Sequence, residues 1–385
     1  MLRPNFVRDQ VADLDLEEKH VQHLLKALPV TENGWTDDVD LQTLFFRLTL
    51  DSATEFLFGE SINSQINALS ENGNTSNSNA SSTLPTEKDF AYAFDNGQHH
   101  LARRFRLGDM YKLHNPKDFR DSIRIVNSFV DYYVQLALNS SSKEKVAEEG
   151  IKSRYVFADG LTEQTRDPDE IRSQLLNVLL AGRDTTASLL SYLFHHLVRH
   201  QEVWTRLRSV VLREFGTYND PTNLTFASLK GCTYLQYCIN ETLRLTTVVP
   251  GNARQALRDT TLPRGGGPNG DKPFFIKKGQ SVEYVIHVIH QRPDLWGPDA
   301  AEWKPERWDG KRPGWEFLPF NGGPRICIGQ QFAIVEASYV IVRLLQRFDA
   351  IEAAGDELTR KVTANLTLTV APGVGPTVRL RAARE

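Results

Sequence analysis

Residues 320–329 read FNGGPRICIG, and this stretch decides how the rest of the chain is interpreted. It places Cys327, one of three cysteines in 385 residues, in a glycine-rich turn before the amphipathic segment IGQQFAIVEASYVIVRLLQRF. A free cysteine is often only a small buried hydrophobe. Here, however, glycines leave backbone N–H groups free to face the sulfur, and the following helix would point the positive end of its dipole at a thiolate. The turn is therefore a candidate metal site, with Gly329 leaving room for a flat ring and Arg325 available to an anionic ligand group.

A second unusual segment lies inside the long apolar stretch IRSQLLNVLLAGRDTTASLLSYLFHHLVRH at 171–200, which predicts a helix. Its centre holds Ala181, Gly182, Asp184 and Thr185, although glycine costs about 1 kcal/mol relative to alanine inside a helix and Asp and Thr are also poor helix formers. Small residues would let a flat group approach the backbone, with a hydroxyl one turn further on and an acid beside it. A conflict of this kind inside a core helix indicates function. A kink formed by Ser and Thr is the alternative, and the sequence leaves both open.

A third motif is the pair Glu241 and Arg244 in CINETLRLTTVVP, spaced to form an ion pair on one face of a helix. Most such pairs are exposed and contribute little to stability. This helix is apolar on several sides, which favours a buried pair, and Arg307 in WKPERW is a possible third member.

The rest of the chain predicts a mainly α fold with a small β portion late in the sequence (α+β). Strand patterns occur at 274–290, with a turn at 278–279, and at 365–380, where a closing hairpin is expected. Residues 61–86 are rich in Asn and Ser and predict a flexible surface loop. Further helices are predicted at 38–59, 87–107, 116–139, 170–199, 200–215 and 232–246.

Composition excludes several classes of protein and site. A net charge of −3 gives no electrostatic reason to expect nucleic acid as a partner. Cys232 and Cys238 have no usual zinc spacing and are interpreted as reduced core thiols. No apolar run reaches the 18 residues typical of a membrane-spanning helix, and the first 15 residues do not have the pattern of a signal peptide.

In this order along the chain, AGRDTT, the Glu-x-x-Arg pair, PERW and FNGGPRICIG resemble the motifs of the cytochrome P-450 family. The resemblance runs from Met1 to the C-terminus. It looks closest to the fungal n-alkane-inducible and fatty-acid-hydroxylating members, as seen in LNVLLAGRDTTA, TTLPRGGGPNG and GWEFLPFNGGPRIC.

The resemblance implies the cytochrome P-450 fold without its N-terminal part. Complete members carry a haem-contacting helix, a small sheet and a membrane anchor before the position of MLRPNF, so we expect a truncated chain whose residues 1–385 form a single haem-binding monooxygenase domain. Complete members lie on the cytosolic face of the endoplasmic reticulum membrane. This chain, with no transmembrane segment, would itself be soluble or peripheral.

The resemblance also assigns roles to individual residues. Cys327 would be the proximal iron ligand of haem b (iron protoporphyrin IX), a cofactor that one thiolate can hold. The haem would be bordered by Phe320, Ala181, Gly182 and Gly329, with its propionates paired to Arg325 and Arg254. Asp184 and Thr185 would relay protons to dioxygen. Glu241, Arg244 and Arg307 would form a structural triad, and the substrate would contact Leu180, Val249 and Leu366.

The function implied is a haem-thiolate monooxygenase that inserts one oxygen atom of O2 into a C–H bond of a hydrophobic small molecule. The substrate would be a long-chain alkane or fatty acid hydroxylated at or near its end, and electrons would come from NADPH through a cytochrome reductase. One alternative is a truncated haem-binding or interaction protein without turnover. Others are a monooxygenase of a secondary metabolite or other hydrophobic substrate, and a haem-thiolate isomerase or reductase.

Overall fold

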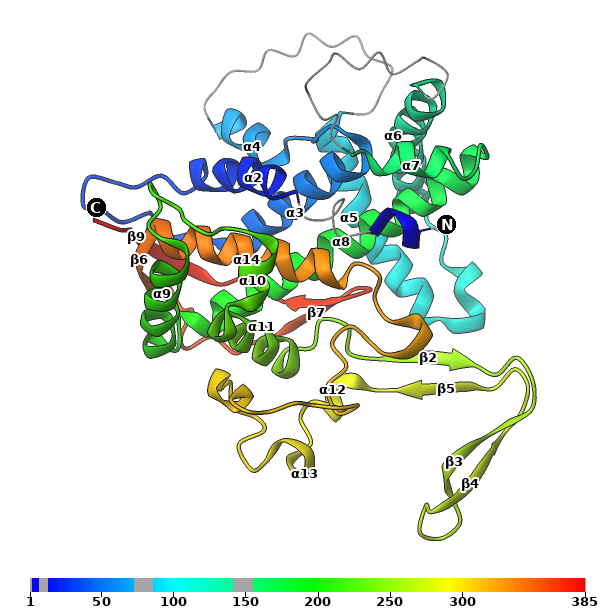
Figure 1. Ribbon diagram of the computed structural model, residues 1–385. Helices are drawn as coiled ribbons and strands as arrows, with labels where there is room; N and C mark the ends of the chain where they lie inside the picture. Colours follow the sequence, from blue (N-terminus) through cyan, green and yellow to red (C-terminus); the bar gives the residue numbers. More distant parts are fainter. Residues whose placement is uncertain (1, 7–12, 73–85, 141–154, 385) are drawn as a thin grey trace.

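The computed structural model describes residues 2–6, 13–72, 86–140 and 155–384, arranged as Figure 1 shows. Helices form most of this part and the strands form small antiparallel sheets, so the predicted mainly α fold with a small β portion is confirmed. The α-helices are α2 (Leu14–Lys26), α3 (Leu41–Phe58), α4 (Ser64–Asn72), α5 (Glu87–Arg106), α6 (Lys117–Ser140), α7 (Phe157–Thr162), α8 (Pro168–Leu197), α9 (Gln201–Phe215), α10 (Phe226–Gly231), α11 (Thr233–Leu245), α12 (Ile286–Ile289), α13 (Pro293–Trp296) and α14 (Gln330–Arg347). The 3₁₀ turns are η1 (Arg3–Phe6), η2 (Gly108–Leu113), η3 (Pro305–Trp308) and η4 (Gly323–Arg325).

The helix α8 forms the centre of the fold. It begins where Asp167 accepts hydrogen bonds from the backbone N–H groups of Asp169 and Glu170 and Pro168 occupies the first turn. The helix α3 is its main neighbour, and α6, α11 and α14 also pack against it. Every residue from Thr186 to His195 is buried, so this third of α8 is held by packing on all sides.

The predicted helices agree closely with the structure. The ranges predicted from periodicity correspond to α3, α5, α6, α8, α9 and α11, with boundaries that differ by at most a few residues. The helix predicted at 38–59 ends where expected, because Gly59 caps α3 with φ +81°, a conformation that favours glycine. Within the described ranges, none of the helices is both long enough and apolar enough to cross a lipid bilayer.

The predicted loop at 61–86 is wrong for its first part, because Ser64–Asn72 is the helix α4. The buried side chain of Asp51 on α3 accepts hydrogen bonds from the backbone N–H groups of Ser64 (2.7 Å) and Gln65 (3.0 Å). These bonds satisfy free donors of the first turn, which the Asn- and Ser-rich composition does not reveal. Residues 73–85 lie outside the described part of the chain.

Strands form within both segments where they were predicted, but several of them pair with other partners than expected. The turn at 278–279 is present, but the strands on its two sides do not pair with each other, because β4 (Lys272–Ile276) pairs with β3 (Thr260–Gly266) and β5 (Ser281–Tyr284) with β2 (Asn252–Gln255). Together they form a ribbon that projects from the helical body (Figure 1). Residues 286–289 form α12 and not a strand.

The C-terminal strands also divide differently from the expected closing hairpin. The strands β7 (Ala364–Leu366) and β8 (Val370–Pro372) form a short hairpin of their own. The last strand, β9 (Thr377–Ala382), lies between β6 (Phe348–Ala353) and β1 (Val39–Asp40). Both pairings of β9 join residues far apart in sequence, so local alternation could not predict them.

Candidate active site

The glycine-rich turn and the middle of α8 border one cavity of about 410 Å³. Further walls come from η1, α3, the end of α11 and the start of α14, and most of the lining side chains are apolar, as is typical of sites for hydrophobic ligands. The predicted site residues on its wall are Ala181, Gly182, Thr185, Val249, Phe320, Arg325, Cys327 and Gly329.

The turn around Cys327 has a fixed backbone geometry. The Cys327 N–H donates to the carbonyl of Phe320 over 2.9 Å. Asn321 has φ +63°, and its side-chain oxygen accepts from the N–H of Gly322 over 2.9 Å. A Cβ at Gly322 would lie 2.6 Å from the ring of Trp315, so that ring fits against the turn only because the residue is glycine.

The Cys327 side chain is exposed to this cavity. The surrounding turn partly buries the thiol and raises its pKa, and the hydrogen bond from the backbone N–H of Gly329 offsets this only in part. The glycine N–H groups were predicted to stabilise a thiolate, but by themselves they do not lower the pKa of Cys327 below its ordinary value. A bound cation would supply the positive charge that converts the thiol into a thiolate ligand.

The space in front of Cys327 fits a flat ring. A Cβ added at Gly182 on α8 would meet no atom closer than the Cβ of Ala53 at 4.0 Å. At Gly329 the nearest atom would be a ring carbon of Phe6 at 3.9 Å. Both glycines therefore border open space on an apolar cavity that also holds a thiol, and these residues fit an iron porphyrin held by one thiolate.

The two arginines expected at the propionates occupy different places. Arg325 lies on the cavity wall with its side chain exposed. Arg254 lies on β2, where its guanidinium donates to the side-chain oxygen of Asn252 (2.9 Å) and to the carbonyl of Ala253 (2.7 Å). The structure thus brings Arg325, but not Arg254, to the cavity.

Of the two residues expected to relay protons, Thr185 faces the cavity and Asp184 is buried in the protein interior. Thr185 lines the cavity, whereas Asp184 is 4% exposed and is contacted by Arg183 (Nη1 to Oδ1, 3.3 Å) and by the side chain of Gln98. Burial raises the pKa of Asp184 to about 6, helped by the charge of Asp95 and opposed by Arg183 and Gln98. An acid with this pKa can both release and regain a proton near neutral pH.

The helix around Asp184 and Thr185 also shows the backbone effect considered as an alternative. The Thr185 hydroxyl donates to the carbonyl of Ala181 over 2.8 Å, and α8 continues through this segment. Back-bonding of this type is usual for Thr in helices. It leaves the hydroxyl oxygen free to accept a hydrogen bond from a group in the cavity.

The predicted triad forms a network in which Glu241 and Arg244 are fully buried and Arg307 is largely buried. Arg244 donates through Nε and Nη2 to the two oxygens of Glu241, both over 2.8 Å, and Arg307 Nε donates to Glu241 over 3.2 Å. Trp308 Nε1 (3.0 Å) and the backbone N–H of Lys304 (3.0 Å) complete the shell around the same carboxylate. A buried ion pair is tolerated when its remaining polar atoms are satisfied in this way.

This network extends to the cysteine turn through His290. Arg244 Nη1 donates to the carbonyl of His290 over 2.9 Å, and His290 Nε2 accepts the backbone N–H of Leu318 over 2.8 Å. Burial lowers the pKa of His290 to about 4, so the ring stays neutral and can accept this bond. The triad therefore fixes the backbone just before Phe320 and Cys327.

The three predicted substrate residues are not brought together. Val249 lines the cavity. Leu180 packs, partly buried, against a hydrophobic cluster beside α8. Leu366 lies on β7 with 48% of its surface exposed, and its carbonyl accepts from Arg106.

Several residues of the site were missed by sequence reasoning. Phe6, Phe56 and Phe332 supply aromatic rings to the cavity wall, and Gln98 contacts the acid on α8. Phe332 could have been found, because it lies in the first turn of the helix that follows the cysteine. The others come from distant segments with no local signal.

Comparisons with known proteins agree with this geometry. The sequence profile of the family described as Cytochrome P450 matches residues 8–373. The chain is similar to "Cytochrome P450 monooxygenase g430" of Fusarium sp, with 53% identity over 96% of this chain and 64% of that protein. It is also similar to "Cytochrome P450 52A12" of Debaryomyces hansenii, with 46% identity over 96% of this chain and 70% of that protein. A third relative is "Cytochrome P450 52A6" of Candida tropicalis, with 47% identity over 92% and 67%.

The chain thus spans about two thirds of the length of these relatives, 64% for the first. The matched region contains the cysteine turn, the central helix with its acid and hydroxyl, and the buried Glu-Arg-Arg network. The chain therefore belongs to the cytochrome P450 family, as its motifs predict.

Proposed function

We propose that this chain is the haem-binding and catalytic part of a monooxygenase that inserts one oxygen atom of O2 into a C–H bond of an apolar substrate. The observation that supports this most directly is that one apolar cavity holds both Cys327 and Gly329 on one wall and Gly182 and Thr185 on another. Such a cavity offers a flat cofactor a sulfur ligand and offers a substrate an apolar surface.

In this proposal Cys327 holds the iron through sulfur, and Arg325 meets an acidic substituent of the ring. When bound, an iron porphyrin with a thiolate ligand supplies the chemistry that splits dioxygen and oxidises a C–H bond. Val248 and Val249, on the cavity wall, would contact the substrate and exclude water. The Thr185 hydroxyl and the Asp184 carboxyl hold the protons that the reaction consumes.

The finer proposal concerns the substrate and the electron donor. The motifs resemble those of fungal alkane and fatty-acid hydroxylases, and the apolar cavity wall suits the chain of methylene groups that both substrates share. We infer terminal or near-terminal hydroxylation of long-chain alkanes or fatty acids, with electrons from NADPH through a separate reductase.

The test begins with the spectrum of the carbon monoxide adduct of the reduced, haem-loaded chain. Wild type is expected to show a thiolate-type spectrum, and Cys327→Ala to lose it. The matched control is Cys232→Ala, because Cys232 is a buried thiol of the core away from this cavity. An unchanged thiolate-type spectrum in Cys327→Ala would overturn the assignment of the ligand.

Turnover with a supplied reductase tests the reaction itself. Hydroxylation of laurate or hexadecane at or near the chain end would support the substrate class, and oxidation of polycyclic compounds alone would contradict it. Haem uptake without NADPH-driven product would instead favour the alternative of a binding protein without turnover.

A further inference from the structure

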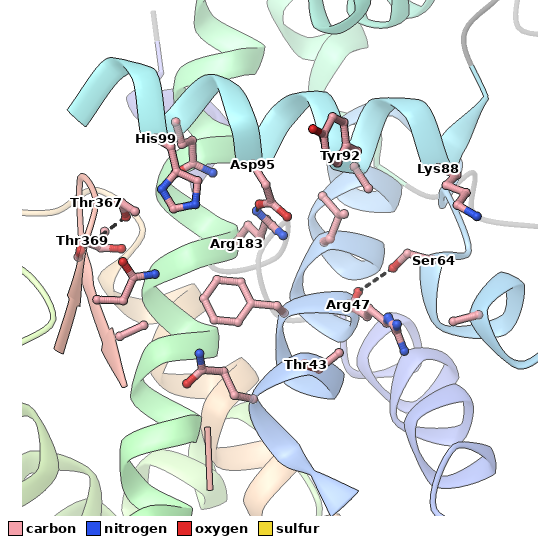
Figure 2. Close-up of a pocket in the computed structure, with 18 of the residues that line it drawn as sticks. Thr43, Arg47, Ser64, Lys88, Tyr92, Asp95, His99, Arg183, Thr367 and Thr369 are labelled. Atoms are coloured by element: carbon pink, nitrogen blue, oxygen red, sulfur yellow. Dashed lines mark hydrogen bonds and ion pairs between the residues drawn. The ribbon is translucent and has the colours of Figure 1, made fainter. Parts of the chain in front are cut away.

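A second cavity, of about 530 Å³, lies between α3, α4, α5, α8 and the β7–β8 hairpin (Figure 2). Its volume is typical of a site for a small molecule, because such sites measure about 300–1,000 Å³. None of the described residues on its wall also borders the cavity at Cys327, so the two cavities have separate walls. Their linings differ as well, since charged and amide side chains border this second cavity.

The charged residues on this wall carry more positive than negative charge. They are Arg47 on α3, Lys88 and Asp95 on α5, and Arg183 on α8. Arg183 forms ion pairs with Asp95 and with Asp184, and Figure 2 shows Asp95 pointing from α5 toward Arg183. Arg47 and Lys88 add further positive charge, which would attract an anion into the cavity.

Arg47 is the cation that a ligand can use. It is a half-buried residue on the cavity wall. Its carbonyl accepts a hydrogen bond from the Ser64 hydroxyl over 3.3 Å, but no residue in the described ranges pairs with its guanidinium. A guanidinium with free N–H groups can bind a carboxylate through two parallel hydrogen bonds. Arg47 therefore favours a carboxylate as the anionic group of the ligand.

Three residues on this wall also hold a buried polar atom that has no hydrogen-bond partner among the described residues. These atoms are Oε1 of Gln42 on α3, Oε1 of Gln98 on α5 and Nε of Arg183 on α8. Gln98 and Arg183 are each 5% exposed. Nε2 of Gln42 donates to the carbonyl of Pro372 over 3.1 Å, and the Gln98 side chain contacts Asp184, so the amide oxygens are the groups left over. Buried polar groups are nearly always paired, so unpaired atoms from three helices at one cavity indicate a polar ligand.

The three unpaired atoms and the rest of the wall define the other groups of the ligand. The amide oxygens of Gln42 and Gln98 need a donor, and Nε of Arg183 needs an acceptor. A hydroxyl group can fill both roles, whereas an ammonium group only donates and would be repelled by Arg183. Phe46 and Leu50 on α3 give the wall an apolar part, which suits an apolar side group.

We propose that this cavity binds a small hydroxycarboxylic acid with an apolar side group, at a site separate from the cavity at Cys327. The carboxylate pairs with the guanidinium of Arg47. A hydroxyl group donates to an amide oxygen of Gln42 or Gln98 and accepts from Nε of Arg183, and the side group packs on Phe46. The binding is non-covalent and does not depend on the proposed reaction.

Isothermal titration calorimetry of the full chain with 3-phenyllactate tests the ligand class. This probe has the carboxylate, the hydroxyl and an apolar ring. We expect 3-phenylpropionate, which lacks the hydroxyl, to bind about fivefold more weakly, because one neutral hydrogen bond is lost. We expect 3-phenyl-1,2-propanediol, which lacks the carboxylate, to bind at least about tenfold more weakly, because a charged hydrogen bond is lost. Equal affinity for all three compounds, or no saturable binding of 3-phenyllactate at millimolar concentrations, would overturn the proposal.

The variant Arg47→Gln tests where the carboxylate binds. It is expected to bind 3-phenyllactate at least about tenfold more weakly than wild type and to lose the preference for 3-phenyllactate over the diol. The matched control is Arg124→Gln, which removes an equal charge from a surface pair on α6 and should bind like wild type. Thermal unfolding gives a second readout, since 3-phenyllactate should raise the unfolding temperature of wild type and of Arg124→Gln but not that of Arg47→Gln. Equal affinity of Arg47→Gln and wild type would refute the site.

The variant Val249→Phe excludes binding in the other cavity. Val249 borders the cavity at Cys327 and not the polar one, so a larger side chain there should leave the affinity for 3-phenyllactate unchanged. Loss of binding in Val249→Phe with binding retained in Arg47→Gln would place the probe in the cavity at Cys327 and overturn the proposal. The titrations need neither haem nor turnover, so a chain that binds 3-phenyllactate but forms no product would contradict only the proposed function. A chain that forms product but does not bind 3-phenyllactate would contradict only this inference.

Discussion

At the scale of single residues, Glu241 and Asp184 are buried carboxylates whose charges are balanced by arginines. The partner of Glu241, Arg244, lies three positions along the same helix, so spacing alone predicts the pair. The pair of Arg183 and Asp95 spans 88 positions, and nothing near either residue indicates it. Local ion pairs were therefore predictable, whereas the pair that shares its arginine with Asp184 required the packing of α5 on α8.

Replacing Glu241 by Gln is expected to destabilise the protein by about 3–5 kcal/mol, because Arg244 would stay buried without its counter-charge, whereas Arg307 keeps Asp299. The free energy of unfolding in urea measures this loss. Glu306→Gln is the matched control, since Glu306 pairs with Arg206 at the surface and contributes at most about 1 kcal/mol. Equal losses in the two variants would contradict the structural role of the triad.

At the scale of elements, periodicity predicted most of the long helices, but missed α2 (Leu14–Lys26) and the short ones. The apolar positions of α3 and α8 repeat every three to four residues over many turns, so their ranges were clear. The nine residues of α4 carry little apolar surface, and the group that caps them lies on α3. The prediction of strand pairing also failed because the partner is not local: β5 pairs with β2, which lies more than twenty residues upstream.

The cap on α4 yields a prediction for that element. Replacing Asp51 by Ala leaves the first N–H groups of α4 without their acceptor and should cost about 1–2 kcal/mol. Hydrogen exchange locates the effect, since amides of residues 64–70 should lose protection before those of α3. Asp51→Asn, which keeps an acceptor oxygen, should lose less. Unchanged exchange in α4 after Asp51→Ala would show that packing alone holds this helix.

At the scale of the whole molecule, the cavity at Cys327 lies where two hydrophobic clusters meet. Leu243 and Val248 on its wall belong to the cluster around α9, α11 and α14, and Phe56 and Leu57 belong to the cluster around α6 and α7. A ligand that fills the cavity would contact both clusters, so its binding would stabilise the entire fold. No local sequence pattern encodes this junction, which arises only when the two clusters pack on α8.

Glu336 lies buried at the same junction and makes the stability of the whole molecule depend on pH. It is 1% exposed on α14 and accepts a hydrogen bond from Ser52 on α3 over 2.5 Å, beside Thr186 on α8. Burial raises its pKa from 4.5 to about 7, while Ser52 and Thr186 oppose this shift. The folded protein therefore holds a proton that the unfolded chain releases between these two pH values.

The sign of the effect follows from this difference in proton binding. Between pH 4.5 and about 7 the folded state binds more protons at Glu336 than the unfolded state, so the stability of the fold falls as the pH rises. Glu336→Gln cannot ionise, and its stability relative to wild type should rise across this window, by on the order of 3 kcal/mol. Unfolding free energies of both proteins at several pH values measure the difference. The control is Glu352→Gln, because Glu352 is an exposed carboxylate. A constant difference between Glu336→Gln and wild type from pH 4.5 to 7 would mean that Glu336 stays ionised at the junction of α3, α8 and α14.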